Sequence, residues 1–193
     1  MIFVHIPHMG DKSIKTAGYD NGEWFIADSF SFGVEREMKE SGEKGGTEDI
    51  NVGVGELHEC NIRKSMDMCS MALAQCAISG NSPGPAEIDF VEVASSENGK
   101  EGRPICYLKY LLERCFIKSW EISGEADDRP TEEVAFYYNK IAFNYAMTPN
   151  GKRWEQGIAM EWDTTAQTTW KSNLSFNPLG RGWKGPRTPS GRK

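Results

Sequence analysis

A cysteine and a histidine two positions apart are the residues of this sequence best suited to do chemistry. Cys60 and His58 share one face of an expected strand, and Glu56 lies in line with them, so that a thiol, a base and an orienting acid follow one another. A thiol attacks as the thiolate, and the carboxylates of Glu56 and Glu59 would raise the pKa of Cys60 rather than lower it. We therefore interpret this group as a mixed strand surface, and we predict no catalytic residue.

A metal site is the second chemistry that these side chains suggest. Its candidate ligands are His58, Cys60, Cys69 and Cys76. Cys69 and Cys76 are seven positions apart on an expected helix, a rise of about 10 Å, whereas one ion needs ligands about 3 to 4 Å apart. Cys106 and Cys115 differ in strand parity and face opposite ways. We expect buried thiols that pack as small apolar side chains, with no metal and no cofactor.

The cysteine count and the start of the chain indicate the compartment. Five cysteines at irregular spacing, without a CxxC pair, do not make a disulfide framework and favour folding in a reducing cytosol. The start, MIFVHIPHMGDK, has no basic region and only a short apolar run, so we expect no signal peptide. No stretch reaches the roughly eighteen apolar residues of a bilayer span, so we expect no membrane insertion.

Charge divides the chain into an acidic body and a basic tail. All 28 acidic residues lie at or before Asp163, and six of the 22 basic residues lie after it. An acidic body repels nucleic acid, so we expect no nucleic-acid partner. We predict one domain over residues 1–166 and a basic extension over 167–193, where the density of Gly and Pro excludes helix and strand.

Only one helix is expected, at about residues 65–79 within the run from Ile62 to Asn81. One stripe of its apolar residues has helical spacing, namely Cys69, Ala72, Leu73, Cys76 and Ala77, and a second consists of Met68, Met71 and Ile78. Ser65 or Asp67 is expected to cap its start, and Gly80 to stop it. A surface helix needs to bury only one stripe. The second stripe therefore predicts a cover from another subunit.

The remaining periodic segments alternate as strands do. They span residues 23–37, 50–63, 86–95, 105–123, 134–147 and 154–162. The Leu-rich middle of 105–123 also suits a helix, but its aromatic and other strand-forming residues favour a strand. Residues 38–49 are charged and Gly-rich, and we expect a long loop there. The pattern predicts a mainly β fold, an antiparallel β-barrel of two packed sheets with one flanking α-helix.

The order of these elements and three short motifs resemble the Hcp family, the tube-forming protein of type VI secretion. The family's N-terminal strand is similar to MIFVHIP, and its I-x-x-x-S-F-S-x-G-V signature is similar to the run from Ile26 to Val34. Its K-x-x-D motif ahead of the helix matches Lys64 and Asp67. The likeness extends over roughly residues 1–165, and the tail has no counterpart in it.

This resemblance implies a structural protein rather than an enzyme, the protomer of the type VI inner tube. It implies a homo-hexameric ring, rings stacked into a hollow tube, contacts with contractile sheath, spike and baseplate proteins, and effector proteins carried in the lumen. It also implies synthesis in the bacterial cytoplasm and secretion through the type VI apparatus. The alternative is a monomeric β-barrel that encloses a small apolar ligand among its many aromatic side chains.

Three parts of the chain supply the predicted subunit contacts. The helix supplies Met68, Met71, Gln75 and Ile78, the loop expected to meet the next ring supplies Glu43 and Lys44, and the tail supplies Trp170, Phe176 and Trp183. The tail mixes aromatic side chains with bases and contains no acid. We therefore expect it to dock on the acidic surface of an adjacent subunit or ring.

Overall fold

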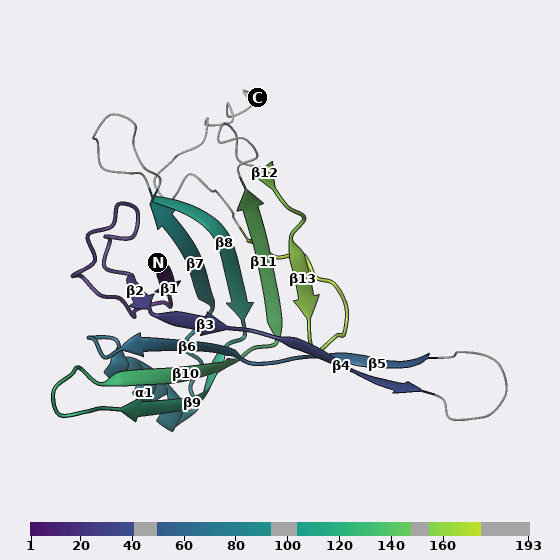
Figure 1. Cartoon of the computed structure of the whole chain (residues 1–193), viewed down its shortest axis with the longest axis horizontal. Helices are drawn as coiled ribbons and strands as arrows, with labels where there is room; N and C mark the ends of the chain where they lie inside the picture. Colours follow the sequence, from purple (N-terminus) through teal and green to yellow (C-terminus); the bar gives the residue numbers. More distant parts are fainter. Residues whose placement is uncertain (41–49, 94–103, 148–154, 175–193) are drawn as a thin grey trace, which may run out of the picture.

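The structure is a computed structural model that describes residues 1–40, 50–93, 104–147 and 155–174. These residues form three antiparallel β-sheets and one helix (Figure 1). Two of the sheets pack on each other, and their strands run steeply across one another in this view. The third sheet is a two-stranded hairpin that projects from the body (Figure 1).

The large sheet has seven strands in the order β12-β11-β8-β7-β1-β2, with β13 also beside β11. Its strands are β1 (Ile2–His5), β2 (Trp24–Ala27), β7 (Ala86–Val93), β8 (Pro104–Glu113), β11 (Lys140–Met147), β12 (Glu155–Gln156) and β13 (Met160–Asp163). In the register of its three central strands, Ile88 lies opposite Tyr110, and Tyr110 lies opposite Phe143. Side chains of β7, β8 and β11 therefore form continuous rows across one face.

The small sheet has four strands in the order β3-β6-β10-β9. They are β3 (Ser29–Ser31), β6 (Cys60–Ser65), β9 (Phe116–Ser123) and β10 (Thr131–Tyr137), and the projecting hairpin consists of β4 (Val34–Glu40) and β5 (Ile50–Leu57). Strict alternation on β6 buries Cys60, Ile62 and Lys64 and exposes the residues between them. One face of the small sheet thus points into the core and the other faces solvent.

The only helix of the described residues, α1 (Ser70–Ser79), packs beside β9. Its Leu73 is fully buried in the same apolar cluster as Cys60 and Ile117, so the helix lies on the core side of the small sheet. Gly80 ends the helix with a left-handed backbone (φ 68°), and its N–H donates to the Cys76 carbonyl. Glycine adopts this conformation without strain, which confirms the expected end of the helix.

The shared core lies where the small sheet and α1 cover part of the large sheet. Its fully buried members include Val4, Phe25, Cys60, Leu73, Ala86, Ile88, Leu112, Cys115, Phe136 and Ile141. A fully buried large apolar side chain contributes about 1.5–3 kcal/mol relative to an exposed one. This cluster draws on both sheets and the helix, and it therefore holds all three layers together.

A second, smaller cluster lies on the opposite face of the large sheet. The segment between β1 and β2 folds over this face and buries Phe3, Ile14, Tyr19, Trp24, Val91 and Cys106. The Tyr19 ring stacks on Phe3 with 4.1 Å between centroids, and its hydroxyl donates to Asp89 Oδ2 at 3.0 Å. Part of each face of the large sheet is therefore covered, one by the shared core and the other by the segment between β1 and β2.

The expected start of the helix was wrong. The helix was placed from about residue 65, but residues through Ser65 belong to β6 and the helix begins at Ser70. Neither expected residue caps the start by its side chain, because Cys69 occupies the N-cap position and makes no such bond. Asp67 instead accepts the backbone N–H of Cys69 at 2.8 Å, within the turn that leads into the helix.

Five of the six expected strands are divided in the structure. Residues 23–37 form β2, β3 and the start of β4, residues 50–63 form β5 and most of β6, and residues 105–123 form β8 and β9. Residues 134–147 form most of β10 and all of β11, and 154–162 contains β12 and most of β13. Arg114 separates β8 from β9 with a positive φ of 50°, which a continuous strand does not allow. The expected loop at 38–49 starts later, since β4 extends to Glu40, and residues 41–49 lie outside the described residues.

The mainly β, antiparallel fold of two packed sheets with one helix is confirmed. Within the described ranges, hydrogen bonds do not close the strands into a continuous barrel, because β3 and β9 remain the edges of the small sheet. No described helix combines the length and apolar character that a membrane-spanning segment requires.

Candidate assembly surfaces

A buried ion-pair network sets the position of α1. The ammonium of Lys64 lies 2.6 Å from Glu132 Oε1 and 2.8 Å from Asp67 Oδ1, and both Lys64 and Glu132 are fully buried. The Ser70 hydroxyl donates to Glu132 Oε1 at 2.8 Å, and the Trp120 indole N–H donates to its Oε2 at 2.7 Å. Every partner is thereby hydrogen-bonded, as buried charges require. The network joins the first residue of α1 to β6, β9 and β10.

This anchoring leaves one stripe of α1 on the outside. Met68 is 85% exposed, Met71 is 57% exposed and Ile78 is 83% exposed, and Gln75 on the same stripe is exposed as well. The other stripe contains the buried Leu73 and packs on the core. The structure thus brings together the four residues predicted as subunit contacts of the helix, on a face that the described part of its own chain does not cover. Three of them lie on α1, and Met68 lies in the turn before it.

A larger apolar surface, which no described segment covers, lies on the large sheet, and we call it the aromatic face. It consists of Ile2, Phe30, Phe32, Phe90, Tyr107, Leu108, Tyr110, Phe143 and Tyr145. Its rings touch in series: Phe30 lies 4.8 Å from Tyr110, and Tyr110 lies 5.0 Å from Phe143. None of these side chains is classed as buried, and Tyr145 is 51% exposed.

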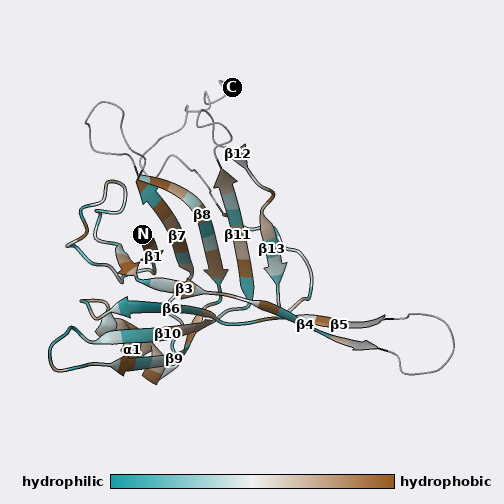
Figure 2. Cartoon of the chain, viewed as in Figure 1, coloured by the Kyte–Doolittle hydropathy of each residue, from teal (hydrophilic) through white to brown (hydrophobic). Residues whose placement is uncertain are grey.

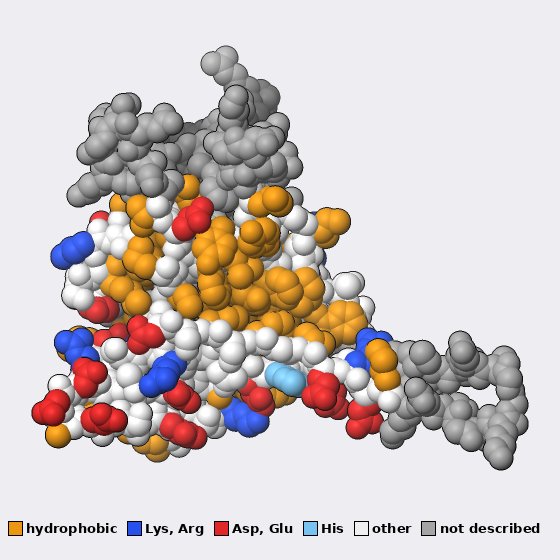
Figure 3. Space-filling view, in the orientation of Figure 1, with side chains coloured by type: hydrophobic (Ala, Val, Ile, Leu, Met, Phe, Trp, Pro, Cys, Tyr) orange, Lys and Arg blue, Asp and Glu red, His pale blue; other side chains and the backbone are white. Residues whose placement is uncertain are grey.

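The aromatic face is visible as a broad hydrophobic patch above the small sheet (Figure 3). Colouring by hydropathy shows hydrophobic segments along β7, β8 and β11 above the small sheet, with hydrophilic residues between them (Figure 2). Large exposed apolar patches are uncommon on monomeric soluble proteins and mark interaction sites. This surface is therefore the strongest candidate for a functional site.

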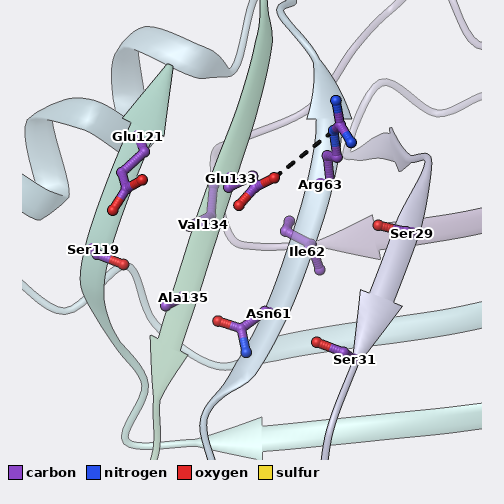
Figure 4. A pocket seen from close by; sticks show the side chains of 10 residues that line it. All are labelled: Ser29, Ser31, Asn61, Ile62, Arg63, Ser119, Glu121, Glu133, Val134 and Ala135. Carbon is purple, nitrogen blue, oxygen red and sulfur yellow. Dashed lines mark ion pairs between the residues drawn. The ribbon is translucent and has the colours of Figure 1, made fainter. Parts of the chain in front are cut away.

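The solvent face of the small sheet has the opposite character. A shallow depression of about 520 Å³ is lined there mainly by short or polar side chains, namely Ser29, Ser31, Asn61, Arg63, Ser119, Glu121, Glu133 and Ala135, while Ile62 and Val134 belong to the core beneath it (Figure 4). Arg63 Nε lies 3.9 Å from Glu133 Oε1 across the two central strands. Such a surface is wet and offers little apolar area to hold a partner tightly.

The expected strand face shared by His58 and Cys60 was wrong. His58 lies in the connection between β5 and β6, where its side chain is half exposed and its Nε2 lies 3.4 Å from Glu35 Oε2. Cys60 starts β6 and is fully buried. Burial raises the pKa of the Cys60 thiol, and the nearby Cys115 raises it further. The two side chains therefore do not form a nucleophile and base pair.

The other cysteines are free thiols within the core clusters or beside them. Burial raises the pKa of Cys69, Cys106 and Cys115 to about 12, so these thiols are protonated at neutral pH. Cys106 and Cys115 belong to different clusters, as expected, but not because of strand parity. A register shift between β7 and β8 and the break at Arg114 interrupt the alternation between them. Over the described ranges, no three His, Cys, Asp or Glu side chains come close enough to hold a metal ion.

The remaining predicted contact residues have different outcomes. Trp170 packs on its own β11, where its indole N–H donates to the Ile141 carbonyl at 3.3 Å and the Lys140 ammonium lies 4.8 Å from its ring centroid. Its role in a subunit contact stays a prediction. Glu43, Lys44, Phe176 and Trp183 lie outside the described residues.

Two features of these surfaces were missed from the sequence. Glu132 was not connected with Lys64, because the pair is 68 positions apart and each residue looks like a solvent-exposed charge in its own segment. The aromatic face was not assigned to one surface, although Leu108, Tyr110 and Leu112 alternate in a way that could have shown it. The missing information was the register that sets Phe90 and Phe143 on either side of β8.

The fold is that of a class of bacterial secretion proteins. A solved structure described as a type six secretion system protein matches with a TM-score of 0.70 at 19% identity, covering 88% of this chain and 98% of that chain. Hcp1 from Salmonella typhimurium matches with a TM-score of 0.63 at 16% identity, covering 88% and 97%. A type VI secretion system effector from Yersinia pestis matches with a TM-score of 0.61 at 15% identity, covering 84% and 99%.

The family model described as "Type VI secretion system effector, Hcp" matches residues 13–145. The chain therefore belongs to the Hcp family of type VI secretion proteins. No curated protein matches the sequence. The Hcp family is one of secreted tube proteins and not a family of enzymes, and the structural likenesses, all below 25% identity, show the shared fold alone.

Proposed function

We propose that this protein is the protomer of a type VI secretion inner tube and assembles as hexameric rings that stack. The observation that carries the proposal is the aromatic face, which the described part of the chain leaves open to solvent. An apolar surface of this kind is stabilised when a second protein removes it from water. Membership of the Hcp family supports a second copy of the chain as that protein.

Two further features support stacking and carriage. The hairpin of β4 and β5 extends away from the body along the strands of the small sheet (Figure 1). Glu43 and Lys44 lie between its two strands in the sequence, and we propose that they contact the next ring. The polar face of the small sheet is suited to line the lumen, because its exposed polar groups would bind effectors only weakly and allow their release.

The location and the other partners follow from the same proposal. The protomer is made in the bacterial cytoplasm, assembles inside a contractile sheath on a baseplate and below a spike, and leaves the cell through the type VI apparatus. The basic tail docks on an adjacent subunit or ring. The alternative, a barrel that encloses a small ligand, has less support. The aromatic side chains contact one another on an open face and do not form the wall of an enclosed space (Figure 3).

Mass in solution and electron microscopy of the purified full chain test the assembly. We expect a hexamer by light scattering at micromolar concentration and rings in projection. A full chain that remains strictly monomeric at every soluble concentration contradicts the proposal. Export is tested separately: the protein should reach the medium only from cells with an intact type VI apparatus, and equal release from cells without it contradicts this part.

A further inference from the structure

An apolar hollow lies at the root of the projecting hairpin, and we call it the hairpin groove. It has a volume of about 530 Å³ and lies between the hairpin and β13. Its apolar walls are Val34 and Leu57 on the hairpin side and Met160 and Trp162 on the β13 side. The hydrophobic surface of the large sheet reaches the root of the hairpin (Figure 3). The groove is therefore an apolar site that the hairpin and the large sheet form together.

Two glycines of β5 leave the space that the groove occupies. Neither Gly53 nor Gly55 has a positive φ, so the backbone conformation does not require glycine at either position. A Cβ on Gly53 would lie 2.9 Å from the Glu37 carbonyl oxygen, and this close approach explains the first glycine. A Cβ on Gly55 would first meet the end of the flexible Arg36 side chain, at 3.3 Å. The fold itself does not explain Gly55, and glycine inside a strand often marks a place where another group approaches closely.

The described residues end beside the same strand, on its other face. Met160 and Trp162 face the groove, and Glu161 between them faces away from it. Ser172 donates its N–H to Glu161 Oε1 at 2.8 Å and donates its hydroxyl to the same oxygen. The described residues end shortly afterwards, at Leu174. The tail therefore starts on one face of β13, and the groove lies on the other.

The tail is long enough to pass round the edge of β13 into the groove. Among the described residues, the outer edge of β13 is joined only by the bridge between Asp163 and Thr168. The residues from Ser175 to Trp183 span up to about 30 Å when extended, whereas packed sheets lie only about 10 Å apart. The run NPLG at 177–180 has the residues typical of a type I turn, which would reverse the chain at this edge.

We propose that the tail of each copy passes round the edge of β13 and seats Trp183 in the hairpin groove of the same copy. The indole ring lies on the flat backbone at Gly55, between the apolar walls. An indole offers a large, rigid apolar surface, and it is the ring on which a guanidinium stacks best. Arg36, whose side chain lies over Gly55, supplies that guanidinium.

The charges on either side of this contact are complementary. Trp183 lies between Arg181 and Lys184, and the tail contains no acid. The two strands of the hairpin contain more acids than bases, namely Glu35, Glu37, Glu40 and Glu56 against Arg36 and Lys39. The bases of the tail therefore meet opposite charge when the indole leaves water.

This inference goes beyond the proposed tube function and is compatible with it. With Trp183 held at the root of the hairpin, the rest of the tail starts beside the strands that lead to Glu43 and Lys44. That remainder contains four bases, Lys184, Arg187, Arg192 and Lys193. The groove would thus direct the basic end of the tail towards the adjacent ring on which we propose that it docks.

Limited proteolysis of the full chain tests the contact, because cleavage reports the fraction of time for which a segment is free. The rate of tryptic cleavage after Arg181 is divided by the rate for a synthetic peptide of residues 175–193 with the same sequence. The wild-type tail should be protected about tenfold. Gly55→Leu fills the groove and Trp183→Ser removes the anchor, so each should abolish the protection. The double variant should behave like either single variant.

Two more variants guard against indirect effects. Asn61→Leu is the matched control, because it adds the same side chain at an exposed strand position on the polar face of the small sheet, and its tail should stay protected. Val34→Lys is a second groove variant. Val34 is 59% exposed, so lysine there should leave the fold intact and abolish the protection. Circular dichroism establishes that each variant folds.

The remaining outcomes overturn the proposal. An unprotected wild-type tail does so, and so does protection that survives Gly55→Leu or Val34→Lys in a folded chain. Gly55→Leu is also co-expressed with Trp183→Ser, and their cleavage products are distinguished by mass. If the Gly55→Leu tails regain protection, they dock in the groove of a neighbour and the same-copy contact is wrong. Light scattering on the same samples reports the rings separately, so failure of the groove contact is distinguished from failure of the tube function.

Discussion

The two halves of one face of the large sheet consist mainly of apolar and aromatic side chains, but they have different surroundings. Near the small sheet, Ala86, Ile88, Leu112 and Ile141 are fully buried. Further along the same strands, Phe90, Tyr110 and Phe143 are only partly buried. The same strands run through both halves, and the side chains change from aliphatic to aromatic, but only the first half is covered by the small sheet and the helix. Apolar residues of a single sheet therefore stabilise the fold in the closed half and are available for association in the open half.

The buried network at the start of α1 is the most sensitive part of the closed half. Glu132→Ala leaves the buried Lys64 ammonium with Asp67 as its one carboxylate partner among the described residues, and it removes the acceptor of Ser70 and Trp120. We expect the free energy of unfolding to fall by about 3–5 kcal/mol in chemical denaturation. Glu133→Ala, one position along and exposed, is the control and should change it by less than about 0.5 kcal/mol. Equal effects of the two would show that the network does not hold the helix.

A matched pair of leucines on β8 compares the two halves directly. Leu112 is fully buried in the closed half, and Leu108 is partly exposed in the open half. Leu112→Ala should lower the free energy of unfolding by about 2–5 kcal/mol, because the substitution leaves a cavity in the core. Leu108→Ala should lower the free energy of unfolding by clearly less. Both variants are measured together with Met71→Glu, so that assembly does not contribute to the measured stability. Equal costs would mean that the open half is as well packed as the closed one.

The two sides of α1 provide the next comparison. Met71→Glu places a charge on an exposed side chain, so the unfolding free energy of the monomer should change by less than about 0.5 kcal/mol. Assembly should nevertheless be lost, because the charge would be buried in the subunit contact. Thermal unfolding and light scattering on the same sample check both parts. Loss of stability with intact assembly would make this stripe part of the monomer's core.

Thiol labelling gives the smallest expected effect and reports on the closed half. Burial raises the pKa of Cys69, Cys106 and Cys115 from 9.0 to about 12, so an alkylating reagent should label the partly exposed Cys76 first. The unfolded thiols ionise near pH 9 while the folded ones keep their protons. The contribution of the buried thiols to the free energy of unfolding is therefore fully present below pH 9 and is lost as the pH rises towards 12. Equally rapid labelling of all five thiols in the folded protein would contradict the burial.

The sequence predicted the features that repeat locally. Both stripes of α1 are visible in its spacing, and Gly80 marks its end. The start of the helix was misplaced because Lys64 looks like a surface residue of a helix. In the structure it belongs to β6, where it is buried and paired with the carboxylate of Glu132 on β10. No local pattern reports a partner that far away. The break at Arg114 was missed for a related reason, since its positive φ occurs without the glycine that usually signals it.

The assembly surfaces were predictable in part. The four helix residues could be selected because a helix with two apolar stripes has more to bury than one core can take. The aromatic face could not, because it exists only when the register sets Phe90, Tyr110 and Phe143 side by side and β3 adds Phe30. A sequence shows which residues are apolar, and the pairing of strands decides whether they form a single surface.

The open half of the large sheet has a consequence for the life of the free chain. If a second molecule completes its packing, the folded protomer gains stability by mass action, and its unfolding temperature rises with protein concentration. Chains that have been synthesised and have not yet found a neighbour form the least protected population and are the first substrates of proteases. The cell's stock of usable subunits then depends on how quickly new chains are captured, as well as on how quickly they fold.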